Sequence, residues 1–121
     1  MFKLDLSKTY QWPVKFSVID EKGSQRQHEI KIIFKRLNRE ELISLNQADF
    51  KPADEKPDAI IEADIDYLCQ FVDGWEGVDI GGDTEFSRDN LRALMNGIPN
   101  INGAINTAFW ESANGGQVRK N

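Results

Sequence analysis

Residues 12–19 read WPVKFSVI, and this stretch decides the first element of the fold. Apolar side chains alternate along it with proline, lysine and serine, which is the period-two pattern of a half-buried strand. The turn-forming run DEKGS follows at residues 20–24, and residues 25–35 (QRQHEIKIIFK) resume the alternation. Two alternating runs around a glycine-containing turn predict an antiparallel hairpin.

The pattern changes to a helical one after the hairpin. Asn38, followed three residues later by Glu41, resembles a capping box at the start of a short helix over 39–48. Apolar residues that recur every three or four positions predict a second, amphipathic helix over 58–72. We expect Gly74 to end that helix.

The last third of the chain predicts two more helices. Several glycines among alternating apolar residues indicate an irregular loop or a small β-ribbon over 75–86. Ser87 is a good N-cap for a helix over 88–96. A fourth helix is expected to begin near Pro99 and to stop at the glycine pair Gly115-Gly116.

These elements predict an α+β fold. An N-terminal antiparallel β-hairpin or small sheet, over about residues 10–37, would pack against a C-terminal bundle of about four helices, over about 38–114. The chain of 121 residues is expected to form a single domain, 1–121, with a flexible tail over 115–121.

Composition excludes several classes of function. The net charge of −5 disfavours nucleic acid as a partner, and no stretch is apolar for the length that a membrane helix needs. Cys69 is the one cysteine and His28 the one histidine, so neither an internal disulfide nor a metal site built from several His or Cys ligands is available.

Carboxylates are the remaining candidates for chemistry. The acidic run over 73–85 lacks the spacing of an EF-hand, and no phosphate-binding loop is present. Pairs such as Glu40 and Glu41, or Asp64 and Asp66, are expected on exposed helix surfaces, where their pKa values would stay ordinary. We therefore predict a protein that is not an enzyme, with no catalytic residue, no cofactor site and no metal site.

Aromatic residues indicate binding instead. Phe109 and Trp110 are adjacent on the last expected helix, so both cannot point into one narrow apolar stripe. Aromatic side chains are enriched at interface hot spots. We expect Phe109, Trp110 and Trp75 to contact a partner.

The order of several short motifs resembles the tail assembly chaperones of long-tailed bacteriophages and prophages. The resemblance spans about residues 12–110. It is carried by IIFKRL at 32–37, NREEL at 38–42, FVDGWEGV at 71–78, FSRDNLRAL at 86–94 and the closing helix at 99–109.

This resemblance implies a non-enzymatic role in the host bacterial cytoplasm. Proteins of this family bind the tape measure protein and keep it soluble during tail assembly. The further partners implied are tail-tube subunits, a longer frameshifted form of the same chain, and other copies of the chain. The alternatives are a structural tail or head–tail completion protein and a small regulatory or enzymatic prophage protein.

The C-terminal residues bear on the frameshifted form. Arg119-Lys120-Asn121 is compatible with a slippery heptamer of the A-AAA-AAC type in the gene. The hypothesis is that a ribosome either stops here or slips into an overlapping frame.

Overall fold

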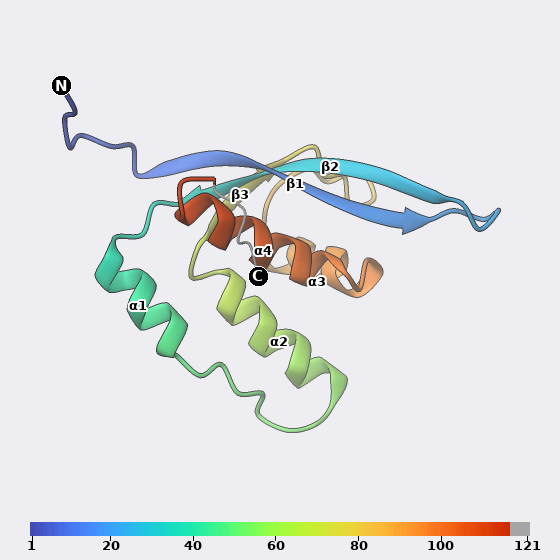
Figure 1. Ribbon diagram of the computed structural model, residues 1–121. Coiled ribbons are helices and arrows are strands. Elements are labelled where there is room, and N and C mark those ends of the chain that lie inside the picture. The colour runs from blue at the N-terminus through green and yellow to red at the C-terminus, as the bar shows by residue number, and fades with distance from the viewer. Residues whose placement is uncertain (117–121) are drawn as a thin grey trace.

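The computed structural model describes residues 1–116 and shows an α+β arrangement, as predicted (Figure 1). The expected tail falls largely on residues 117–121, and these, with the Arg119–Asn121 motif, lie outside the described residues. The elements follow the chain in the order β1 (Thr9–Ile19), β2 (Gln25–Lys35), α1 (Arg39–Gln47), α2 (Pro57–Leu68), β3 (Val72–Glu76), α3 (Arg88–Gly97) and α4 (Ile101–Ala113).

The predicted hairpin is confirmed. Strands β1 and β2 pair antiparallel along their whole length, from Thr9 opposite Lys35 to Ile19 opposite Gln25. At the turn, one carboxylate oxygen of Asp20 accepts the backbone N–H groups of residues 22 and 24, each at 2.9 Å. These bonds satisfy backbone donors that the ladder does not reach, so the sequence of the turn fixes the register of the strands.

Strand β3 is the main departure from the prediction. The helix expected over 58–72 ends at Leu68, and the residues that follow pair antiparallel with β2, giving the strand order β1-β2-β3. Gly74 does not end a helix but lies within β3, opposite Ile33. A Cβ atom at Gly74 would lie 3.3 Å from the Cδ1 atom of Ile33, so the missing side chain permits close packing on β2.

The predicted helix starts are confirmed for α1 and α3. The Asn38 side chain accepts the Glu41 N–H at 2.8 Å, while the Asn38 N–H donates to the Glu41 carboxylate at 3.0 Å. The Ser87 hydroxyl accepts the Asn90 N–H at 3.1 Å. Helix α4 begins at Ile101, so Pro99 lies before the helix.

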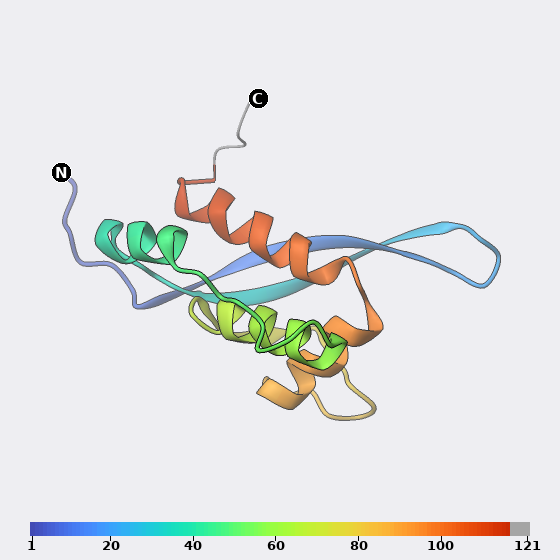
Figure 2. The ribbon, with the colours of Figure 1, turned by 90° about the horizontal axis from the view of Figure 1, so that it is seen from below.

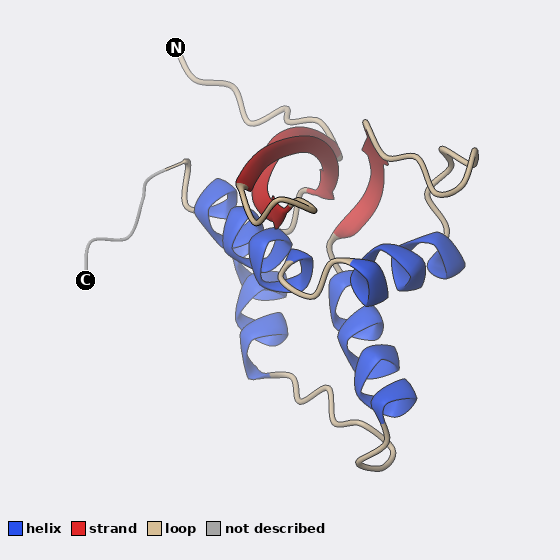
Figure 3. Ribbon diagram, turned by 90° about the vertical axis from the view of Figure 1, so that its right-hand side faces the viewer, coloured by secondary structure: helices blue, strands red, loops and turns tan. Residues whose placement is uncertain are grey.

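The helices lie on one side of the sheet (Figures 2 and 3). Helix α4 runs along β1 and is bonded to it near both ends. The Asn100 side chain donates to the Ser17 carbonyl oxygen at 3.1 Å, and the Tyr10 and Ser112 hydroxyls lie 2.6 Å apart. Since Asn100 precedes α4 and Ser112 lies in its last turn, α4 runs antiparallel to β1.

Three buried phenylalanines join the sheet to the helices. The rings of Phe71 and Phe109 are stacked with their centroids 4.0 Å apart, and Phe34 meets Phe109 edge-on at 5.3 Å. All three side chains are almost fully buried. Burial of each contributes about 1.5–3 kcal/mol relative to exposure. The core therefore lies where β2, α4 and the turn after α2 meet.

Candidate partner-binding site

The three residues predicted to contact a partner lie at different depths. Phe109 is 1% exposed and belongs to the core. Trp75 is also buried, its indole N–H donates to the Thr84 carbonyl oxygen at 3.1 Å, and Phe86 packs edge-on at 5.0 Å. Trp110 is half-buried. A partner that leaves the fold intact can therefore contact the side chain of Trp110 but not the buried side chains of Phe109 and Trp75.

Trp110 is held in place by hydrogen bonds and packing. Its indole N–H donates to the Tyr67 hydroxyl at 3.1 Å, and this hydroxyl donates to the Asn106 side-chain oxygen at 2.6 Å. The ring of Trp110 packs edge-on against Phe109 with centroids 5.4 Å apart. The exposed part of the indole is thus presented in one fixed orientation, which lowers the entropy cost of binding.

Trp110 lines a groove of about 360 Å³ between α1 and α4, which we call the α1–α4 groove. Leu42 and Ile43 of α1 supply aliphatic surface, and Ile43 is 46% exposed. The remaining lining residues are three amides and one arginine: Asn46, Gln47, Asn114 and Arg39. The groove therefore has apolar side chains, a polar rim and a positive charge at one end.

A second hollow lies beside the opposite face of helix α1. It has a volume of about 440 Å³ and is lined by apolar Leu37, Leu45 and Phe50 and by acidic Glu40 and Glu41, among others. Leu45 is the one buried residue of this nine-residue helix. A helix that buries so little apolar surface is held weakly, so its position is the easiest part of the site to change.

The lone histidine and the lone cysteine lie on different elements of the fold. His28 is exposed on β2 and stacks on Phe16 with the ring centroids 5.6 Å apart. Cys69 is half-buried at the end of α2, where its carbonyl oxygen accepts the Lys35 ammonium at 3.2 Å. The imidazole ring of His28 thus packs on a neighbouring strand residue, and the Cys69 side chain packs against the hydrophobic core.

The acidic run over 73–85 shapes a turn. The Asp79 carboxylate accepts the Gly82 N–H at 2.7 Å, and the Asp83 carboxylate accepts the Glu85 N–H at 3.0 Å. The latter bond, with the Asn90 side chain, lowers the pKa of Asp83. Within residues 1–116, no three His, Cys, Asp or Glu side chains are grouped as a metal site requires.

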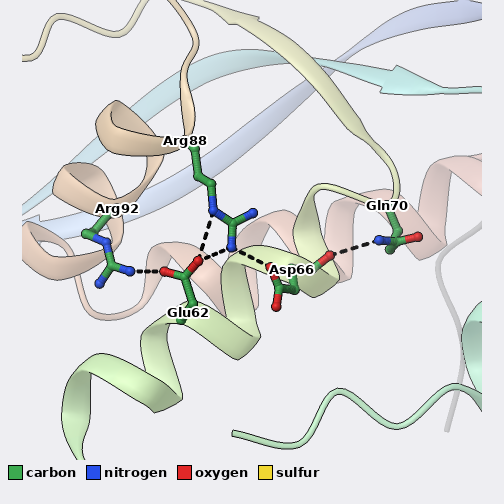
Figure 4. Close-up of polar contacts among 5 residues, drawn as sticks. All are labelled: Glu62, Asp66, Gln70, Arg88 and Arg92. Atoms are coloured by element: carbon green, nitrogen blue, oxygen red, sulfur yellow. Dashed lines mark hydrogen bonds and ion pairs between the residues drawn. The ribbon is translucent and has the colours of Figure 1, made fainter. Parts of the chain in front are cut away.

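Carboxylates on α2 pair with arginines of α3 (Figure 4). The Glu62 carboxylate accepts the Arg88 Nε–H at 3.0 Å and also bonds Arg92, while Asp66 bonds the same Arg88. Such exposed pairs are worth little individually, but together they fix α3 against α2. Asp64 differs from the expectation, because it is half-buried and this desolvation raises its pKa.

Nearly the whole sequence matches one known protein family. A family model described as "Phage tail assembly chaperone" matches residues 1–120. The chain belongs to the phage tail assembly chaperone family. No curated protein and no solved structure matches this tail assembly chaperone. In the described part of the chaperone, residues 1–116, each helix is too short or too polar to span a membrane.

Sequence reasoning missed the contribution of α1 to the groove of this chaperone. Leu42 and Ile43 are adjacent on a short helix, and adjacent helical positions point about 100° apart. The core of the tail assembly chaperone therefore cannot bury both. Two adjacent large apolar residues on one helix therefore indicate that one of them is exposed, as Phe109 and Trp110 do on the last helix.

Proposed function

We propose that this tail assembly chaperone binds the tape measure protein in the α1–α4 groove and keeps it soluble in the host cytoplasm during tail assembly. The role is one of binding and not of catalysis. The family match supports the general role. The observation that carries the site is the fixed, half-exposed indole of Trp110 beside exposed Ile43.

The groove has the chemistry that an apolar-striped helix needs. A long helical chain with an unpaired apolar stripe aggregates, and a partner that covers the stripe prevents this. Helix-in-groove binding uses a few apolar anchors inside a polar rim. Trp110 and Ile43 offer the apolar contacts, while Arg39 at the rim favours an acidic residue on the bound helix.

Further partners belong to the same proposal. Tail-tube subunits would displace the chaperone as they polymerise around the tape measure protein, and many copies of the chaperone would coat one long chain by self-association. A longer frameshifted form would share the whole fold described above. Reading the codons for Arg119-Lys120-Asn121 tests this form, because a non-slippery sequence with no overlapping frame removes it.

Co-expression with the tape measure protein tests the function. We expect the tape measure protein to be soluble with the chaperone and to aggregate without it. If it is equally soluble alone, the proposed function fails. A structural tail protein would instead be found in purified virions, so mass spectrometry of virions distinguishes that alternative.

A matched pair of variants tests the groove. Ile43 and Ile60 are exposed to 46% and 44%, but Ile43 lines the groove and Ile60 lies on α2 away from it. We expect Trp110→Ala and Ile43→Ala each to weaken binding by about tenfold or more, which is about 1.4 kcal/mol. Ile60→Ala should bind normally, and equal losses for Ile43→Ala and Ile60→Ala would refute the site.

A further inference from the structure

The first seven residues form an arm with an unused strand pattern. Phe2, Leu4 and Leu6 alternate with Lys3 and Asp5, and the three apolar side chains are 78%, 85% and 51% exposed. The structure assigns neither helix nor strand to these residues, which we call the N-terminal arm. Period-two alternation is typical of a strand that buries one face, so the arm lacks the surface that would cover it.

The root of the arm is fixed. The Arg36 side chain donates to the Ser7 carbonyl oxygen at 2.8 Å, and the Arg36 N–H donates to the Lys8 carbonyl oxygen, also at 2.8 Å. The arm leaves the end of the sheet and extends away from it (Figure 1). Folding back along its own β1 requires a reversal at Ser7 and Lys8, where these bonds hold the backbone. The arm of a second copy can approach β1 without such a reversal of the chain.

Strand β1 has an open edge with a groove beside it. In the sheet of residues 1–116, β2 occupies one edge of β1 and no strand occupies the other. On that edge the Ser17 carbonyl oxygen already accepts the Asn100 side chain and Pro13 has no N–H, so the backbone groups left for pairing include those of Gln11 and Lys15. A groove of about 470 Å³ is lined by Trp12, Pro13 and Lys15 of β1 and by Gly103, Ala104, Thr107, Ala108 and Glu111 of α4. Trp12 packs against the hydrophobic core on the helix side of β1, and Lys15, three residues along the strand, lies on the opposite face. The groove therefore reaches around the open edge, and we call it the β1-edge groove.

We infer that the N-terminal arm of a second copy of this chaperone adds to β1 as a fourth strand. The backbone of the arm pairs with the open edge of β1, as in β-strand addition. The apolar side chains Phe2, Leu4 and Leu6 enter the β1-edge groove beside Trp12 and the small residues of α4.

The charges on the outer face agree with this pairing. Lys15 lies opposite Glu29 in the register of β1 and β2, on the outer face of the sheet. Asp5 is the acidic residue on the charged face of the arm, and an added strand brings this face next to Lys15. An open strand edge with an exposed apolar arm on the same chain is a liability unless each covers the other.

Two variants block the contact from opposite sides. Deleting residues 2–7 removes the arm, and Gly103→Gln fills the β1-edge groove. A Cβ at Gly103 meets no atom within 4 Å, so this substitution leaves the fold intact. Gly97→Gln is the matched control, because Gly97 is equally open but lies on α3, outside the groove.

Self-association of the purified chaperone is measured by sedimentation and native mass spectrometry. We expect the deletion and Gly103→Gln each to weaken it by at least about tenfold, and Gly97→Gln to leave it unchanged. A mixture of the armless chain and Gly103→Gln should form a mixed complex, because one copy still has the groove and the other still has the arm.

The inference is overturned if the wild-type chaperone is monomeric, if either variant associates as the wild type does, or if the mixed complex does not form. An arm that instead crosslinks to the tape measure protein also overturns it. The inference deepens the self-association proposed above. The self-association assay uses the chaperone alone, so a negative result there does not contradict binding of the tape measure protein. Likewise, a failure to bind the tape measure protein does not contradict pairing of the N-terminal arm with β1.

Discussion

Phe109→Ala separates the core from the surface of the last helix. Phe109 is 1% exposed, stacks on Phe71 at 4.0 Å and meets Phe34 edge-on at 5.3 Å. The substitution removes the ring that joins α4 to the sheet and leaves a cavity bounded by two other rings. We therefore expect a loss of stability and not a selective loss of binding.

The magnitude follows from the burial of the ring. Phe→Ala in a core costs about 3–5 kcal/mol, which includes the lost transfer free energy and the cavity. A chain of 121 residues has a total stability of roughly 6–18 kcal/mol at ~0.05–0.15 kcal/mol per residue. At about 4 °C per kcal/mol for this size, we expect the melting temperature to fall by roughly 12–20 °C.

Urea unfolding followed by circular dichroism and tryptophan fluorescence measures the loss. The control is Phe109→Leu, which keeps an apolar side chain and should cost less than Phe109→Ala. Trp110→Ala should also cost less, because Trp110 is half-buried. A Phe109→Ala variant that retains stability within about 1 kcal/mol of wild type would refute the assignment of this ring to the core.

Two further predictions concern the helices. Asn38→Ala removes the side-chain oxygen that accepts the Glu41 N–H in the capping box, so we expect α1 to lose about 1 kcal/mol and its amide protons to exchange faster, while exchange in the sheet is unchanged. Asp64→Asn should raise stability at neutral pH, because burial raises the folded-state pKa of Asp64 above its value of 3.8 and so penalises the charged form. This gain should shrink as the pH falls through the folded-state pKa, where the wild-type carboxyl becomes protonated, and melting temperatures of both proteins across that pH range test it.

Features set by nearby residues could be predicted from the sequence. The hairpin turn depends on Asp20, and the starts of α1 and α3 depend on Asn38 and Ser87, each of which bonds backbone groups two to four residues away. Local chemistry of this kind is visible in a single sequence.

The third strand could not be predicted in this way. Phe71 and Val72 continue the apolar spacing of α2, so periodicity alone extends the helix through them. Their structure is decided by pairing with β2, where Val72 lies opposite Phe34 and Trp75 opposite Ile32. Those partners are about forty residues away along the chain, and no local pattern records them.

The proposed partner-binding surface was predictable only in part. The adjacency of Phe109 and Trp110 indicated that one of them leaves the core, and the structure shows that it is Trp110. Trp75 carries the same residue type but is buried over Thr84 and Phe86. Which tryptophan is accessible depends on tertiary packing, so the α1–α4 groove became visible only in the structure.

The position of β3 in the chain constrains how the protein is made on the ribosome. The β1–β2 hairpin is complete once residue 35 has emerged, yet the edge of β2 that β3 covers stays open until residue 76 has followed. During that interval the nascent chain exposes the apolar face of the hairpin together with an unpaired strand edge. The order of synthesis thus leaves this strand edge unpaired at a stage when α3 and α4 have not yet been made.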